Sequence, residues 1–127
     1  MRTLCATGLL LLAASCGGGP PDIRLTPEEQ ALLRPIPDAP EPVRRMVAHG
    51  DELFIQATPA YRRSNPDAGG DWATQNSMAV DLYTRARQSY IAAQAESGLM
   101  VPPAVSERAR ECLIRIVALQ KQKRAAR

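Results

Sequence analysis

The single histidine of the chain, His49, lies two and three positions before Asp51 and Glu52 and is the first candidate for acid–base or metal chemistry. At about 100° per residue, His49 and Glu52 share the outward face of a predicted helix, whereas Asp51 points away from both. A zinc site needs three or four converging ligands, and the sequence contains no second histidine. We therefore expect an ordinary polar helix face here, with no metal site and no cofactor.

The cysteines offer little more chemistry. Cys112 falls on the apolar stripe of a predicted helix, and no histidine is positioned by the sequence to activate it as a nucleophile. Glycine loops of the kind that cradle phosphate and a serine in a nucleophile elbow are both missing from the sequence. We predict that Cys112 is a buried small hydrophobic residue and that the protein is not an enzyme.

The elements that position these residues are helices. A helical hairpin is predicted from Asp71 to about Lys123, with its turn at residues 98–103. The apolar residues of its first helix share one face: Trp72, Ala79, Leu82, Tyr83, Ala86, Tyr90 and Ala93. Those of its second helix, which starts near Pro103, are Val105, Ala109, Cys112, Leu113 and Ile116, with Gln120 beside them. Arg108 and Arg115 are expected to lie away from this stripe.

A third helix is predicted from Pro42, because apolar residues recur there at helical spacing from Val43 to Ala57, and Thr58-Pro59 should end it. Val80 and Ile91 form a second apolar line on the first hairpin helix, and that line requires a third helix as a neighbour. The sequence thus predicts a small all-α domain of three main helices. Its core should include Leu53, Phe54, Leu82, Tyr83, Tyr90, Leu113 and Ile116.

The first sixteen residues differ from the rest. Arg2 precedes an apolar run, Leu9 to Ala14, which is too short to span a bilayer permanently. The stretch Ala13-Ala14-Ser15-Cys16 resembles the lipobox of bacterial lipoproteins, although Ala13 stands where that family most often has leucine. The resemblance implies that residues 1–15 are a signal peptide and that Cys16 is lipidated; an ordinary cleaved signal peptide and an uncleaved anchor are the alternatives.

The same resemblance implies a location in the cell envelope. Lipoproteins with aspartate after the cysteine commonly stay in the inner membrane, and Gly17 stands at that position here. The resemblance therefore implies the outer membrane, facing the periplasm, if the source is Gram-negative. Nucleic acid is not an expected partner of an exported chain.

Between the lipobox and the helical domain of residues 42–127, residues 16–41 are predicted to form a proline-rich tether with one short helix. Thr26, Pro27 and Glu29 form a capping box with proline at the first helical position, and the helix can run only to Arg34. The segment either docks through Leu25, Leu32, Leu33 and Ile36 or remains mobile.

The first hairpin helix also resembles the second helix of a tetratricopeptide repeat, in which aromatic residues and alanines alternate as Tyr83, Ala86, Tyr90 and Ala93 do here. The closing proline of that family would fall at Gly98, and the first helix of the repeat lacks its usual residues. The resemblance covers about a dozen residues, and the length excludes an array. An ordinary amphipathic helix explains the spacing equally well.

Charge is divided unevenly along the chain. Residues 16–83 contain 6 basic and 10 acidic residues, a net charge of −4, whereas residues 84–127 contain 9 basic and 3 acidic residues, a net charge of +6. The basic end either complements the dipole of the last helix or contacts an anionic surface. Ile114 lies opposite the predicted stripe of that helix and is a candidate apolar contact for a protein partner. The candidate partner-binding residues are Ile114, Arg110, Arg115, Lys121, Lys123 and Arg124.

These observations predict a lipid-anchored envelope protein that acts as a non-enzymatic protein-interaction or structural module. One alternative is a small enzyme or ligand carrier that uses a cleft between helices, which a pocket holding His49 beside Tyr83 or Tyr90 would favour. Another is binding of anionic lipid or cell-wall polymer by the basic C-terminal helix.

Overall fold

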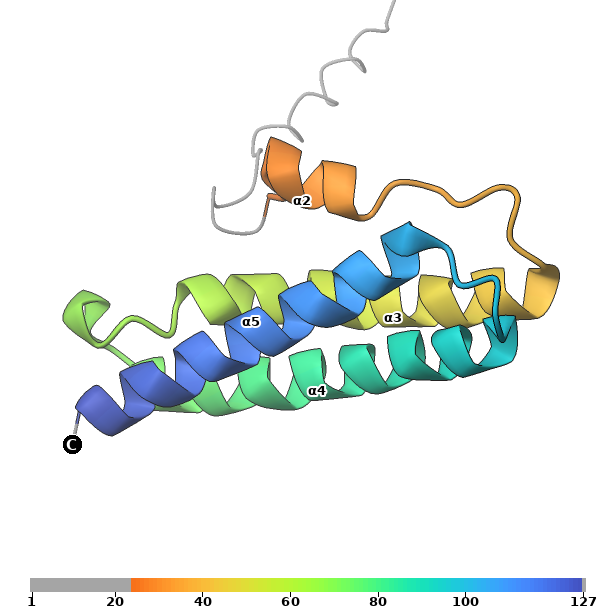
Figure 1. The fold of residues 1–127 in the computed structure, drawn as a ribbon. Coiled ribbons are helices and arrows are strands. Elements are labelled where there is room, and N and C mark those ends of the chain that lie inside the picture. The colour runs from red at the N-terminus through yellow and green to blue at the C-terminus, as the bar shows by residue number, and fades with distance from the viewer. Residues whose placement is uncertain (1–23, 127) are drawn as a thin grey trace, which may run out of the picture.

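The computed structural model describes residues 24–126, and the regular elements in this range are all helices (Figure 1). Three helices are long: α3 (Glu41–Arg62), α4 (Trp72–Ser97) and α5 (Pro103–Ala125). The short helix α2 (Pro27–Leu32) precedes them, and the 3-10 turn η2 (Pro66–Ala68) lies between α3 and α4. The prediction of an all-α domain with three main helices is confirmed.

The helix α4 is the centre of the bundle. It packs along both α3 and α5, whereas α3 and α5 approach each other at few points (Figure 1). The short helix α2 lies on the opposite side from α4, over the seam between α3 and α5. The bundle therefore has two well-packed helix pairs and one seam that a fourth element covers.

The α3–α4 contact is close because one residue in it lacks a side chain. A Cβ atom added to Gly50 would lie 2.5 Å from the Tyr90 ring, so only glycine lets the two backbones approach this far. The aromatic rings of Phe54 and Tyr83 meet edge to face, with centroids 5.1 Å apart. The buried face of α4 also contains several alanines. Because their side chains are small, α3 and α4 can pack closely although the chain has few aromatic residues.

Helix α3 does not end where the sequence predicts. Thr58-Pro59 was expected to terminate it, yet the helix continues through Pro59 to Arg62. Proline removes one backbone hydrogen bond, to the carbonyl of Ile55, on a side of the helix where Ile55 is exposed and water can take its place. The Thr58 hydroxyl donates to the Phe54 carbonyl at 2.9 Å, and Tyr61 beyond the proline packs on the Tyr83 ring. Tertiary packing thus outweighs the local preference.

The buried face of α5 is rotated from the predicted one, toward Arg108 and Arg115. Cys112 is fully buried as expected, but both arginines are buried too, at 1% and 8% exposure, so their placement on the outer side was wrong. Leu113, expected in the core, is 42% exposed. Carboxylates of α2 and α3 face α5 on this side, and they draw the arginines inward.

The remaining core predictions have mixed outcomes. Leu53, Phe54, Tyr83 and Tyr90 are buried as predicted, whereas Leu82 and Ile116 are only partly buried. Of the second apolar line on α4, Val80 packs partly on the core and Ile91 is 41% exposed.

The capping box of α2 forms as predicted. The Thr26 amide donates to the Glu29 carboxylate at 2.9 Å, and the Glu29 amide donates to the Thr26 hydroxyl at 3.1 Å. Leu32, Leu33 and Ile36 pack partly against the core. Of the two possibilities for this segment, the structure therefore shows the docked one.

The rotation of α5 predicts opposite outcomes for two leucines on one helix. Leu119 is fully buried, so Leu119→Ala should lower the free energy of unfolding by about 2–5 kcal/mol. Leu113→Ala should change it by about 0.5 kcal/mol or less, because that side chain already meets water. Chemical denaturation followed by circular dichroism measures both; a larger loss for Leu113→Ala than for Leu119→Ala would contradict the observed face.

Candidate functional site

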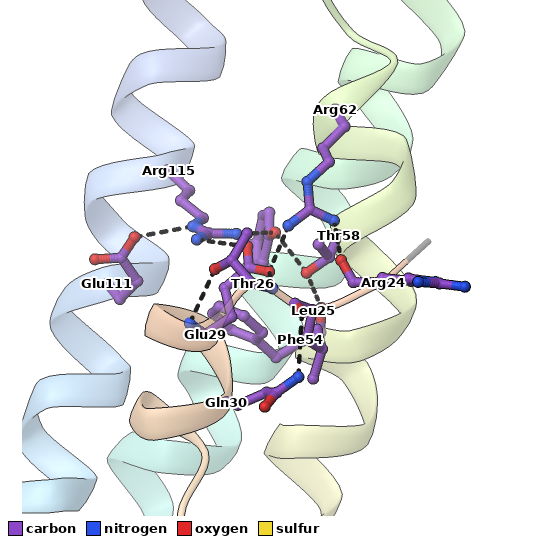
Figure 2. Close-up of polar contacts among 11 residues, drawn as sticks. Arg24, Leu25, Thr26, Glu29, Gln30, Phe54, Thr58, Arg62, Glu111 and Arg115 are labelled. Carbon is purple, nitrogen blue, oxygen red and sulfur yellow. Dashed lines mark hydrogen bonds and ion pairs between the residues drawn. The ribbon is translucent and has the colours of Figure 1, made fainter. Parts of the chain in front are cut away.

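The most concentrated group of polar side chains surrounds the carboxylate of Glu29 beneath α2 (Figure 2). Glu29 is 4% exposed and pairs with two arginines from different long helices: Arg62 of α3 and Arg115 of α5, the latter at 2.9 Å. Arg62 also donates to the Arg24 carbonyl at 2.9 Å. One buried carboxylate thus joins α2 to both sides of the seam.

Arg115 is held in place by more than Glu29. Its Nε donates to Glu111 at 2.9 Å, and its Nη1 donates to the hydroxyl of Tyr83 at 2.9 Å. The guanidinium carbon also lies 5.0, 4.7 and 5.6 Å from the ring centroids of Phe54, Tyr61 and Tyr83. A guanidinium stacks well on aromatic faces, so the cation is stabilised inside an aromatic environment.

The hydroxyl groups behind Arg115 form a directed chain. The single Thr58 hydroxyl proton is used on the Phe54 carbonyl, so the Tyr83 hydroxyl must donate across the 3.1 Å contact to Thr58. Tyr83 then accepts from Arg115. The chain is complete only while Arg115 is charged and Tyr83 is protonated. Burial raises the pKa of Tyr83, which keeps its hydroxyl protonated.

Glu29 itself stays ionised. Burial alone would raise its pKa, but the Thr26 amide and the side chains of Arg115 and Arg62 outweigh burial and bring the pKa below the ordinary value of 4.5. We name Glu29, Arg62, Arg115, Tyr83 and Glu111 the Glu29 cluster.

A second group lies nearer the other end of α2 and uses the other buried arginine of α5. Arg108 Nη1 contacts the two carboxylate oxygens of Asp51 at 3.0 and 3.3 Å, and the Tyr90 hydroxyl donates to Asp51 at 2.5 Å. Arg108 Nε donates to the Leu32 carbonyl at 2.8 Å, and its Nη2 donates to the Arg34 carbonyl. A cation thus satisfies carbonyls at the C-terminal end of α2. Asp51, Tyr90 and Arg108 form the Asp51 cluster.

The polar side chains of the two clusters join α2 to the long helices. Every buried side-chain polar atom among residues 24–126 has a hydrogen-bond partner. Burial raises the pKa of Tyr90, so its hydroxyl stays protonated and donates to Asp51. Burial also raises the pKa of Asp51, while the hydrogen bond from Tyr90 and the charge of Arg108 oppose that rise. Their partners are other parts of the chain, and the common result is that α5 holds α2 at both of its ends.

The residues first considered for chemistry lie apart. His49 is exposed, and burial raises the pKa of the fully buried Cys112 thiol to about 12, which makes it a poor nucleophile. Within the described range no group of three or more potential ligands is placed to hold a metal ion. A hollow of ≈ 210 Å³ lies beside the Asp51 cluster and the link to α3, and His49 is not in its lining.

The predicted partner-binding residues divide into two groups. Ile114, Arg110, Lys121, Lys123 and Arg124 are exposed on α5, whereas Arg115 is buried in the Glu29 cluster and cannot contact a partner. Leu113, a predicted core residue, and Val117, for which the sequence predicts no role, join Ile114 on the outward face at 42% and 45% exposure. The prediction that Ile114 is exposed is confirmed, at 52%. Cys16, the predicted lipidation site, lies outside the described residues.

Sequence reasoning missed both clusters, although a signal for them exists. Arg108, Cys112, Arg115 and Leu119 follow the i, i+4, i+7, i+11 spacing of one helix face. Two arginines on a face that also bears a predicted buried cysteine indicate buried cations, which must meet carboxylates from other elements. Which carboxylates they meet depends on the docking of α2.

Comparison of the chain with models of known protein families, with curated proteins and with solved structures finds no match. The likeness of α4 to a tetratricopeptide-repeat helix therefore stays a resemblance in spacing, and its four residues Tyr83, Ala86, Tyr90 and Ala93 are all fully buried. Across residues 24–126, none of the helices has the length and apolar character that crossing a membrane requires.

The neighbouring residues Glu28 and Glu29 offer a matched test of the Glu29 cluster. Glu29→Gln removes the buried charge and should lower the free energy of unfolding by about 1–3 kcal/mol, whereas exposed Glu28→Gln should leave it nearly unchanged. Because the folded state lowers the pKa of Glu29, its ionised form favours folding. The difference between wild type and Glu29→Gln should be complete above about pH 4.5 and shrink as pH falls through the folded-state pKa. Equal losses in the two variants, measured by denaturation at several pH values, would contradict the assignment.

Proposed function

We propose that this protein is a lipid-anchored protein of the cell envelope whose helical domain acts as a non-enzymatic protein-interaction module. The observation that carries the proposal is a row of exposed aliphatic side chains on α5. Leu113, Ile114 and Val117 are 42%, 52% and 45% exposed, and they lie opposite the face that α5 buries. We name these three residues the α5 row.

The α5 row differs from the other exposed apolar residues on the long helices. Ile55, Met78 and Ile91 are exposed singly, on α3 and α4, and isolated apolar residues are normal on a protein surface. The α5 row instead gathers three aliphatic side chains within little more than one helical turn. Such a group fits the apolar centre of a protein interface.

The surroundings of the α5 row favour one kind of partner. Exposed Arg110 precedes it by one turn and exposed Lys121 follows it by one turn, with Lys123 and Arg124 beyond. A partner with an apolar contact surface bordered by acidic residues would match both features. The buried arginines of α5 add nothing to this surface, because their charges are used inside the fold.

The proposed attachment to the membrane rests on the sequence. The lipobox resemblance at Ala13-Ala14-Ser15-Cys16 supports lipidation of Cys16, and two or more acyl chains are enough for stable anchoring. An anchor of this kind would leave the helical domain in the aqueous space beside the membrane, where a protein partner can reach the α5 row.

The anchoring part predicts a mature chain that begins at an acylated Cys16. Cys16→Ser should leave the protein unprocessed or free of the membrane, whereas Cys5→Ser, within the predicted signal, should be processed normally. Intact-mass measurement and detergent partition test this. A mature N-terminus elsewhere without an acyl adduct would overturn the anchoring proposal.

The interaction part predicts that Ile114→Asp abolishes capture of a protein partner from crosslinked cells while leaving the fold intact, because the side chain already faces water. Ile55→Asp is the matched control: Ile55 is 45% exposed, on α3, and its substitution should not affect capture. Quantitative mass spectrometry of captured proteins and circular dichroism of each variant give the result. Equal capture by wild type and a folded Ile114→Asp variant would remove the α5 row from the interface.

A further inference from the structure

The short helix α2 is attached to the bundle in an unusual way. Within Pro27–Leu32, the one buried residue is a carboxylate, Glu29, and Leu32 is only partly buried. Six residues are too few for a stable isolated helix, so α2 depends on its contacts with the bundle. Those contacts are largely polar, between Glu29 and two arginines and between Arg108 and two carbonyls.

The surface beneath α2 keeps its own supports. Arg115 remains bonded to Glu111 and Tyr83 and stacked among three aromatic rings without any contribution from α2. Arg108 likewise keeps its two contacts with Asp51. If α2 left, neither buried arginine would lose its last carboxylate or hydroxyl partner, so the seam would keep the charge pattern that binds Glu29.

We propose that the seam between α3 and α5 is a peptide-binding groove, filled by α2 of the same chain and open to a short acidic helix of a partner protein that competes for it. The groove presents Arg62 and Arg115 to a carboxylate (Figure 2). It presents Arg108 to the carbonyls at the end of the helix. Helix α2 thereby occupies the binding site of the partner and inhibits it.

The residues of α2 define the chemistry of the partner. Glu29 is at the third helical position after a capping threonine, and Leu32 and Leu33 follow three and four positions later on the side that meets the core. A competing helix needs the same arrangement: a cap, a carboxylate at the third position and two aliphatic residues one turn further on. The flanking Glu28 is exposed and is not part of the pattern.

Competition within one chain makes the groove hard to reach. A tethered segment such as α2 acts at an effective concentration in the millimolar range. A partner helix can therefore displace α2 only if its affinity for the groove is high or if the contacts of α2 are weakened. The groove is on the opposite face of α5 from the α5 row. The two surfaces can therefore be tested separately, and Ile114→Asp should leave the groove unaffected.

The experiment measures binding of a fluorescent peptide with the sequence of residues 24–39 to the purified full chain in detergent, by fluorescence anisotropy. Glu29→Ala in the chain weakens α2 and leaves the groove intact, so this variant should bind the peptide about tenfold or more tightly than wild type. Thr26→Ala, which removes only the cap of α2, should increase the affinity for the peptide by a smaller factor. This variant replaces Glu29→Ala in the experiment if Glu29→Ala does not fold. Added salt should weaken the binding.

Two control peptides test which carboxylate the groove recognises. A peptide with Glu28→Ala should bind the Glu29→Ala chain as well as the natural sequence does, and a peptide with Glu29→Ala should not bind. Absence of binding to a folded Glu29→Ala chain, or equal binding of both control peptides, would overturn the proposal. A concentration-dependent dimer of the wild-type chain that Glu29→Ala abolishes would also overturn it, because the competing helix would then be α2 of a second copy.

Discussion

The ion pair between Arg115 and Glu29 joins the last helix of the bundle to the segment that precedes its first long helix, in a place nearly closed to water. A buried charge is costly unless each of its polar atoms is matched, and here the match requires residues from every helix of the domain. Arg62 comes from α3, Tyr83 from α4, and Glu111 from α5 itself. The cluster thus specifies how the helices are arranged as much as it stabilises them.

The helices themselves follow from local sequence. Hydrophobic periodicity locates α3, α4 and α5. It also gives most of the buried faces of α3 and α4, because those faces consist of apolar side chains and one glycine, with Thr58 and Asn76 as the buried polar exceptions. The capping box of α2 is equally local, since its two hydrogen bonds join residues three positions apart. The position at which α3 ends is not determined by local sequence. Pro59 lies inside the helix, and the packing of Tyr61 on Tyr83 stabilises the last turn.

The buried face of α5 could not be obtained by counting apolar residues, because two of the side chains that it buries are arginines. Hydrophobic periodicity places arginines on the exposed face of a helix. Their burial in α5 depends on carboxylates that are far away in the sequence. Asp51 and Arg108 are separated by 57 residues, and Gln122 reaches the Ser64 carbonyl across 58. The outward position of Ile114 survived this rotation because the predicted and observed stripes of α5 both leave it exposed.

The buried cysteine of α5 gives the protein an internal reporter of its own motions. Cys112 is fully enclosed and burial raises its pKa to about 12, so a thiol reagent reacts with it only during moments when the core opens. Cys112 also lies on the same face as Arg108 and Arg115, between the two contacts that hold α2. The rate of its modification therefore measures how often the seam between α3 and α5 opens, although Cys112 itself takes no part in either polar cluster.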